Sequence, residues 1–349
     1  MTIRKSLALA SCIWLGATAM AQAADSHAST FAVEAHFQLP GTERWDYVGF
    51  DAVRHHLFVS RDTYVQVVDT ESGHRVGQIA NMSGVHGFAF AQNHKLGFVT
   101  NGRGNTIAVV DLDTLKTVDT IQAGGADPDG ILYVPDSDRI WVSNGHAHSV
   151  SVVDPVSRHI EATIDVGGKP ETIAADRDGH VFVNIEDKNE IVEIDAKHST
   201  VMAHWTLAPC EEPSGLAIDA DSKRLFATCS NQRMAVVDAT TGHVVAQLPI
   251  GDHPDAAAFD PVLKVALSSN GDSSTLTVIH EDDPDHFSVS QNVRTRSGAK
   301  TMALDETHHR VYLVSARFGP APKATTQKPN PHPTIVPGSV EVVVVAPPA

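Results

Sequence analysis

Seven polar residues recur along the chain at a spacing that would let them act together. They lie 40 to 45 residues apart, and they are Asp46, His86, Asp129, Glu171, Ser214, Asp255 and Lys300. Four carboxylic acids with one imidazole and one amine could hold a metal cation, or hydrogen-bond a polyhydroxylated or amine-bearing molecule. Carboxylates suit calcium or magnesium, whereas imidazoles favour zinc or copper. This chemistry requires a fold that brings residues far apart in the sequence to one place.

A repeated module of the sequence accounts for that spacing. Two copies read DGILYVPDSDRIWVSNGHAHSVSVVD at residues 129–154 and SGLAIDADSKRLFATCSNQRMAVVD at residues 214–238. The aspartates that close five copies lie 41 to 43 residues apart, and they are Asp69, Asp111, Asp154, Asp195 and Asp238. This is the period of four-stranded propeller blades, and alternating Val, Ile and small residues between turn signals predict the strands. Seven first strands predict an all-β fold, a seven-bladed β-propeller of four-stranded antiparallel blades.

The two ends of the chain are expected to complete one blade. Residues 340–345 align with third strands, so the last blade lacks an outer strand, and residues 33–39 resemble the outer strands of other blades. We therefore predict that the N-terminal strand completes the C-terminal blade and closes the ring, which leaves no long unpaired edge. Because successive blades share continuous cores, we expect a single propeller domain over residues 24–349.

Short elements of the repeat resemble a known family. Leu-Phe-Val-Ser at 57–60, Ile-Trp-Val-Ser-Asn at 140–144 and the recurring Val-Val-Asp are similar to the YVTN repeats of the YncE-like β-propellers of the bacterial periplasm. The resemblance covers about residues 31–346. Arg44-Trp45-Asp46-Tyr47, with residues 317–320 and 335–339, is similar to one branch of that family. The resemblance implies the fold and supplies no catalytic residues, because propellers host many unrelated functions.

Blade geometry predicts which residues surround the mouth of the central channel. The connection into the innermost strand and the one between the second and third strands emerge on the same face. The candidate ligand-binding residues are therefore Asp46, His86, Asp129, Glu171, Asp255, Lys300, Arg103, His146 and Arg317. A divalent metal ion is the one cofactor that these residues suggest, with His86, Asp129, Glu171 and His148 as its ligands. Because four of the hub positions are acidic, we expect a net-negative mouth that suits a cation.

Three interpretations of these residues stay open. They satisfy only backbone groups and water, or they capture a small polar or cationic ligand or a partner protein, or they form a metal-dependent hydrolase or lyase similar to the gluconolactonase-like propellers. We expect the second, a binding module rather than an enzyme, and we assign no catalytic residue. The sequence contains no serine-hydrolase elbow, zinc-protease, haem-attachment or phosphate-loop motif.

The last blade departs from the repeat between residues 319 and 338, which include six prolines. A proline-rich segment is stiff and extended. We expect this insertion to arch over the mouth and to form one wall of the binding site, with Arg317, Phe318 and His332 facing inward. By contrast, histidines in turns between first and second strands, such as His55 and His308, are expected to be solvated turn residues.

Composition and the first residues suggest where the protein acts. The chain has 26 basic and 42 acidic side chains and a formal net charge of -16, which disfavours nucleic acid as a partner. Residues 1–23 resemble a signal peptide, with two basic residues before an apolar stretch, and predict a periplasmic or secreted protein. Lipidation at Cys12 is the alternative at this end. No later apolar run is long enough to be transmembrane, and no feature indicates the oligomeric state.

Two cysteines remain after the expected processing. Cys210 lies in the connection that enters the fifth blade, and Cys229 ends the second strand of that blade. Antiparallel pairing would bring these two ends together. In an oxidising compartment they would form a disulfide, and otherwise they would be two buried thiols that act as small apolar residues.

Overall fold

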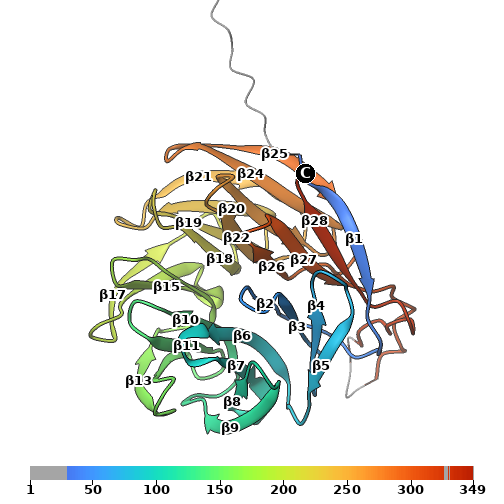
Figure 1. Cartoon of the computed structure of the whole chain (residues 1–349). Coiled ribbons are helices and arrows are strands. Elements are labelled where there is room, and N and C mark those ends of the chain that lie inside the picture. Colours follow the sequence, from blue (N-terminus) through green and yellow to red (C-terminus); the bar gives the residue numbers. More distant parts are fainter. Residues whose placement is uncertain (1–29, 326–328, 330, 349) are drawn as a thin grey trace, which may run out of the picture.

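The computed structural model describes residues 30–325, 329 and 331–348. The predicted signal peptide and Cys12 lie outside the described residues. Within them, 28 strands form seven antiparallel sheets of four strands each. The sheets follow one another around a ring (Figure 1). The predicted all-β, seven-bladed β-propeller is confirmed.

Each blade contributes an innermost, a second, a third and an outer strand. The innermost strands of blades one to seven are β2 (Val48–Asp51), β6 (Val85–Ala91), β10 (Pro128–Val134), β14 (Pro170–Ala175), β18 (Pro213–Asp219), β22 (Pro254–Asp260) and β26 (Met302–Asp305). The second strands are β3 (His56–Ser60), β7 (Leu96–Asn101), β11 (Arg139–Asn144), β15 (His180–Ile185), β19 (Arg224–Cys229), β23 (Val265–Asn270) and β27 (Arg310–Ser315).

The outer half of the ring has the same order. The third strands are β4 (Val65–Asp69), β8 (Thr106–Asp111), β12 (Ser149–Val153), β16 (Glu190–Asp195), β20 (Arg233–Asp238), β24 (Thr275–Asp283) and β28 (Glu341–Ala346). The outer strands are β5 (Arg75–Ile79), β9 (Lys116–Gln122), β13 (Ile160–Asp165), β17 (Thr200–Thr206), β21 (Val244–Pro249), β25 (His286–Arg294) and, in the seventh blade, β1 (Ala32–Gln38). Three short 3-10 turns join strands, namely η1 (Gln92–His94), η2 (Gly102–Gly104) and η3 (Glu186–Lys188).

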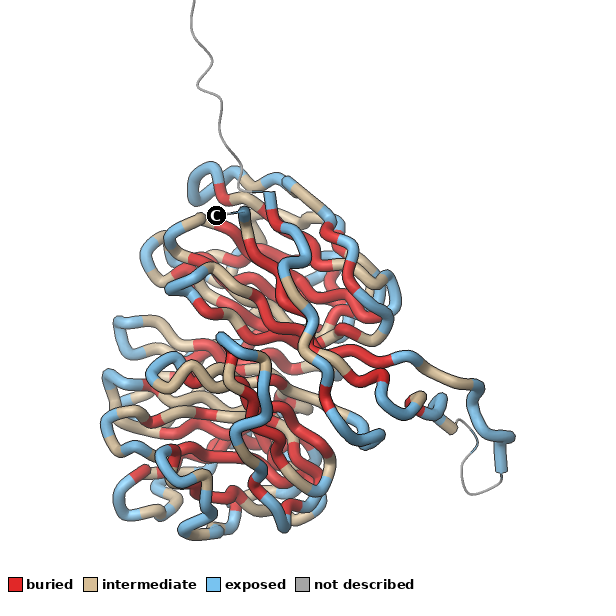
Figure 2. The backbone as a smooth tube through the Cα atoms, turned by 45° about the vertical axis from the view of Figure 1, so that its right-hand side comes forward, coloured by how far each residue is buried: buried red, intermediate tan, exposed pale blue. Residues whose placement is uncertain are grey.

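The middle strands are apolar on both faces because each blade packs between two others. In the third blade, Val150 and Val152 pack against residues of the fourth blade. Ile140 and Val142 of the same blade pack against the second blade. Burying both faces in this way stabilises the sheet on each side by the removal of apolar surface from water. Figure 2 shows the result as buried stretches that run through the blades, with exposed residues mainly at the turns.

The repeated aspartate that sets the period of the sequence makes a turn. At or directly after the end of the third strand, its carboxylate accepts backbone N–H bonds from residues that follow, as Asp154 does from Val156 (2.8 Å) and Ser157 (2.7 Å). Asp195 and Asp238 do the same in blades four and five. A short carboxylate that mimics a backbone turn explains why aspartate recurs at this point.

The N-terminal strand closes the ring, as predicted. β1 pairs antiparallel with β28, with Ala32 opposite Ala346 and Gln38 opposite Glu341, and Figure 1 shows the two strands side by side. Leu39 is buried in the core between the seventh and first blades. The expected strand at residues 33–39 is therefore present, shifted by one residue.

A disulfide joins Cys210 to Cys229 in the fifth blade. Its sulfur atoms lie 2.06 Å apart, and both residues are buried. This resolves the choice that the sequence left open between a disulfide and two thiols. Among the described residues, no helix is long and apolar enough to cross a bilayer.

Candidate functional site

The fold places the seven recurring polar residues at equivalent points, where the chain enters each innermost strand. His86, Asp129, Glu171, Ser214 and Asp255 are each the second residue of such a strand, and Asp46 and Lys300 come two residues before β2 and β26. We call these seven positions the hub residues and this end of the ring the mouth. Four of the strands begin with proline, which has no N–H to donate and is tolerated at a strand's first residue.

Five hub residues from five blades form one chain of contacts. The Nδ1 of His86 lies 2.6 Å from Asp46 Oδ2 and 3.5 Å from Asp129 Oδ1. The Nζ of Lys300 lies 3.4 Å from Asp46 Oδ1 and also forms an ion pair with Asp255. Asp46 is thus held between an imidazole from the second blade and an ammonium from the seventh. The topology brings together groups that lie more than 200 residues apart in the sequence.

A lysine that the sequence analysis missed belongs to the same site. Lys169 directly precedes β14, and its Nζ lies 2.5 Å from Glu171 Oε1 and also pairs with Glu186. The signal was available, because an X-Pro-polar tripeptide opens four innermost strands, as in Lys169-Pro170-Glu171. The first residue of the equivalent tripeptide in the third blade is Asp127, which lies 3.2 Å from His146 at the rim of the mouth.

Tyr47 is the second residue that the sequence analysis did not select. Ser60 fixes this segment, since its hydroxyl accepts the N–H of Asp46 (2.7 Å) and donates to the carbonyl of Tyr47 (3.0 Å). Burial, with the negative charges of Asp129 and Glu171, raises the pKa of the Tyr47 phenol well above its usual value. The phenol therefore stays protonated beside the hub carboxylates and can donate a hydrogen bond.

The ionisation states of the hub follow from burial and from these pairings. Burial would lower the pKa of His86, but Asp46 and Asp129 raise it to about 9. Burial, opposed by His86, raises the pKa of Asp129 to about 7. Burial and the neighbouring Asp129 raise the pKa of Glu171 to about 9. Burial alone would raise the pKa of Asp46, yet His86 and Lys300 hold it below its usual value.

These states change the electrostatic expectation for the mouth. At neutral pH the imidazolium of His86 and the ammonium groups of Lys300 and Lys169 stand against the carboxylates, and Glu171 is protonated. The net-negative mouth expected from the sequence is therefore largely neutralised. That expectation counted one lysine and took every carboxylic acid as ionised.

A cavity of about 530 Å³ opens beside Lys300, between the sixth, seventh and first blades. Its walls are Arg44, Trp45, His253, Asp272, Ser297, Gly298, Lys300, Phe318, His332 and Pro333. The rings of Trp45 and Phe318 have centroids 6.1 Å apart, and the guanidinium of Arg44 donates to the carbonyl of Pro333 (3.2 Å). Two of the three segments that resemble one branch of the YncE-like family thus meet in one cavity, through Arg44 and Trp45 from the first and Phe318 from the second.

The proline-rich insertion only partly follows its expected course. Phe318 and Ile335 form a bridge at its base, and Phe318 and His332 line the cavity as expected. Arg317 instead lines a separate cavity with Arg296 and Glu341. Beyond its base, the described residues of the insertion extend outward from the edge of the ring (Figure 2). The expectation that the insertion arches over the mouth was therefore wrong.

Comparison with known proteins supports the family resemblance. Residues 52–179 match the model of the YNCE-like beta-propeller family. Over these residues the propeller resembles that family. A search of curated proteins finds no match.

Among solved structures, a "Kuenenia stuttgartiensis Hydrazine Synthase" chain has a TM-score of 0.70 and 17% identity to this propeller, over 79% of this chain and 92% of that one. U3-55K has a TM-score of 0.71 at 9% identity, over 88% and 97% of the two chains. The RRP9 WD40 repeats have a TM-score of 0.72 at 9% identity, over 89% and 97%. At these identities the likeness extends to the fold alone.

The remaining candidate residues of the propeller lie farther out. Arg103 is mostly exposed and pairs with Asp62 (2.7 Å). His146 is exposed beside Asp127, and His148 is exposed in the turn between β11 and β12. These residues surround the rim, whereas the hub contacts lie inside it.

The metal ligands suggested by the sequence do not come together as one set. His86 and Asp129 group with Asp46, their ligand atoms lying within 4.8 Å of one another. Glu171 is bound to Lys169, and His148 belongs to an exposed turn. A divalent ion at the first three residues would have to replace the ammonium of Lys300 on Asp46 and the proton of His86. The pairings therefore favour a mouth whose charges are balanced by its own side chains.

Proposed function

We propose that this YncE-like propeller is a binding module that captures a small polar molecule at the mouth. The observation that carries the proposal is the cavity of about 530 Å³ in which two aromatic rings stand beside the hub residue Lys300. Ligand sites are typically concave, with apolar walls and a few fixed polar groups that set orientation. Here Trp45 and Phe318 supply the apolar wall, and Lys300 and Arg44 supply the polar groups.

The charges around the cavity favour an anionic group on the ligand. Arg44, Lys300 and two imidazoles line it, against one carboxylate, Asp272. The hub carboxylates Asp46 and Asp255 already hold the ammonium of Lys300, so they are poorly placed to recognise an external cation. We therefore propose a small organic anion with a flat apolar body, in place of the cationic ligand suggested by the sequence.

Thermal unfolding with matched probes tests this proposal. Benzoate and indole-3-acetate should raise the unfolding midpoint, because a molecule that binds only the folded state stabilises it. Benzylamine and tryptamine, which have the same rings with an amine, should not. The effect of the acids should vanish in Trp45→Ala and persist in Trp205→Ala, because Trp205 packs on Phe182 in the fourth blade. A response to the amines but not to the acids would contradict the proposed ligand class.

We also propose that the protein is exported and works outside the cytoplasm. The support is the sequence of residues 1–23 together with the buried disulfide between Cys210 and Cys229, which suits an oxidising compartment. The test is cell fractionation of the full chain, with the N-terminal sequence of the product. Cleavage close to residue 23 would support export by a signal peptide, and a lipid on Cys12 would support the lipoprotein alternative. An uncleaved cytoplasmic protein would contradict both.

A further inference from the structure

The face opposite the mouth has a regular system of aspartates. Five innermost strands end in an aspartate or are directly followed by one, and these residues are Asp51, Asp176, Asp219, Asp260 and Asp305. In each, Oδ1 accepts backbone N–H groups of the following turn, and Oδ2 faces a basic side chain. Every one of these carboxylates is therefore fixed in place with one oxygen directed toward a partner.

The residue four positions after the aspartate in this turn contacts the equivalent aspartate of the preceding blade. Lys264 lies four residues after Asp260, and its Nζ donates to Asp219 of the preceding blade (2.9 Å). His309 lies four residues after Asp305, and its Nδ1 lies 2.7 Å from Asp260 Oδ2, again in the preceding blade. The same position in the first blade is His55, four residues after Asp51. Because the ring is closed, the blade that precedes the first blade is the last one, and its equivalent aspartate is Asp305.

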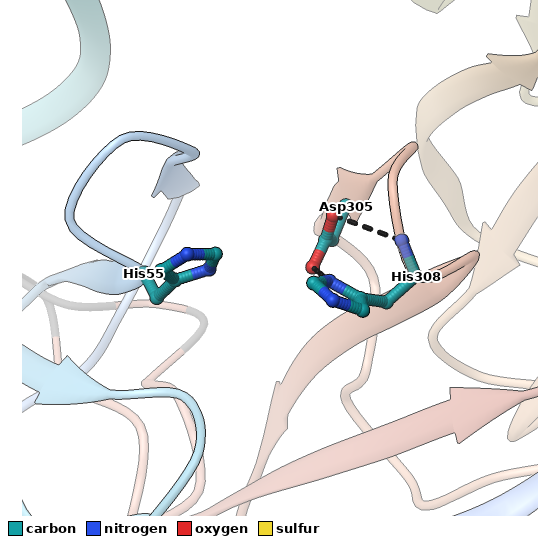
Figure 3. A group of neighbouring side chains, drawn as sticks. All are labelled: His55, Asp305 and His308. Carbon is teal, nitrogen blue, oxygen red and sulfur yellow. Dashed lines mark hydrogen bonds and ion pairs between the residues drawn. The ribbon is translucent and has the colours of Figure 1, made fainter.

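At this seam two imidazoles converge on one carboxylate. Asp305 Oδ2 already lies 2.8 Å from the Nδ1 of His308, which belongs to its own turn. The rings of His55 and His308 have centroids 5.9 Å apart. Figure 3 shows His55 on one element facing the Asp305–His308 pair on the other. Among the described residues, the Nδ1 of His55 is buried and has no hydrogen-bond partner.

We propose that His55, His308 and Asp305 bind a divalent transition-metal ion at the seam between the first and last blades. One nitrogen from each imidazole and one carboxylate oxygen lie within 4.8 Å of one another, so small side-chain rotations bring all three to a common ion. Two imidazoles with one carboxylate is a donor set that zinc accepts, with a fourth position left for water. The imidazoles bind the ion in their neutral form, so the metal takes the place of a proton.

The site differs from the seams at Asp219 and Asp260 because two imidazoles, rather than one basic group, lie close to its aspartate. Asp219 and Asp260 each accept one basic group from the following blade, so their bonding is complete without an ion. Asp305 is buried, with its side chain 2% exposed, and its Oδ1 is held by the N–H groups of Thr307 and His308. This rigidity preorganises the oxygen ligand. A metal here would link the first blade directly to the last, beside the closure that β1 provides.

Zinc titration of chelator-treated, untagged protein tests the site. Calorimetry should show one zinc ion bound per chain, and His55→Ala and His308→Ala should each weaken that binding at least tenfold. The matched control is His180→Ala, which removes an imidazole paired with Asp176 on the same face and should bind zinc as the unaltered chain does. Bound zinc should also raise the unfolding midpoint of the unaltered chain and not that of His55→Ala.

Each other outcome would overturn the proposal. Zinc binding that is absent, or unchanged in His55→Ala, would show that the seam holds no metal. Binding that His86→Gln abolishes while His55→Ala leaves it intact would place the ion at the mouth instead, where His86 groups with Asp46 and Asp129.

Cobalt absorption spectra distinguish coordination by imidazole from loose surface binding. If His55→Ala fails to fold, His55→Gln keeps the size of the side chain and gives the same comparison.

Discussion

The two faces of the ring use equivalent positions of the repeat in different ways. On the face opposite the mouth, five blades place the same residue type, aspartate, at the end of the innermost strand, and each makes the same turn. At the mouth, the equivalent positions carry Asp, His, Asp, Glu, Ser, Asp and Lys, and five of these seven residues form one chain of contacts between unlike groups. The positions that carry the same residue in several blades form the turns of the fold, and the positions that differ between blades determine the chemistry of the mouth.

The largest effect is expected from opening the ring that supports both faces. Deleting residues 31–40 removes β1, exposes the edge of β28 and removes the buried Phe31 and Leu39. Since losing one large core side chain costs about 3–5 kcal/mol, the deletion should cost more than about 5 kcal/mol of unfolding free energy. Urea unfolding followed by circular dichroism measures this. A truncated chain that unfolds at the same urea concentration as the intact chain would contradict the closure by β1.

A sharper test of the comparison uses the two ends of β22, where Asp255 faces the mouth and Asp260 the opposite face. Asp260 is fully buried and accepts N–H bonds from Val262 and Leu263 and a contact from His309. Asp260→Ala should therefore cost about 3 kcal/mol, at about 1 kcal/mol for each bond. Asp255→Ala should cost about 1 kcal/mol or less, because the Asp255 side chain is 28% exposed and Lys300 keeps its contact with Asp46.

Both variants are measured by urea unfolding at pH 7, each as the matched control of the other. Equal losses of stability would mean that the mouth is as structural as the opposite face. A larger loss in Asp255→Ala would reverse the comparison. The response to benzoate should be weakened more by Asp255→Ala than by Asp260→Ala, because Asp255 holds Lys300 beside the cavity and Asp260 does not.

The pH dependence of stability should also arise at the mouth. His86 has a folded pKa of about 9, above its unfolded value, so its contribution is fully present below pH 6.5 and is lost as the pH rises through 9. Glu171 acts in the same direction, because an acid whose folded pKa is about 9 binds its proton more tightly when folded. Unfolding free energy should therefore fall by about 2 kcal/mol or more between pH 6.5 and pH 9.

Replacing His86 with glutamine separates this contribution from the rest. His86→Gln should be less stable than the unaltered chain at pH 6.5 and should lose less stability as the pH rises to 9. Urea midpoints at four pH values between these limits measure both slopes. Parallel slopes in the two proteins would show that His86 is not the source of the pH dependence.

The sequence allowed the blades to be predicted because each blade repeats its own local signals. Aspartate turns, alternating apolar strands and proline-led innermost strands recur in register, so the seven hub residues could be placed at one mouth. Their charge balance could not be predicted, because it depends on Lys169, which pairs with Glu171 and Glu186. The equivalent position in other blades is not a lysine, so the repeat does not indicate this contact. The course of the insertion was missed because residues 319–338 have no counterpart in the other blades, so the repeat gives no information about them.

On the opposite face, the sequence did not predict that His55 and His308 lie together. His55 and His308 were expected to be solvated turn residues, and as single turn positions they give no other signal. Only the ring brings the first blade beside the last, so that the His55 ring lies next to the Asp305–His308 pair, and the Nδ1 of His55 is buried. A contact between the two ends of a repeat array depends on the number of blades, so it follows from the closed structure rather than from any one repeat.

The smallest effect is expected at the rim of the mouth, where Arg103 pairs with Asp62. The Arg103 side chain is 61% exposed and that of Asp62 is 43% exposed. Exposed ion pairs contribute about 0–1 kcal/mol, so Arg103→Ala should change the unfolding free energy by less than about 0.5 kcal/mol. It should also leave the response to benzoate unchanged, because Arg103 does not line the cavity beside Lys300. A loss of that response in Arg103→Ala would extend the functional mouth from the hub to the rim, and the division between varied hub and solvated rim would no longer hold.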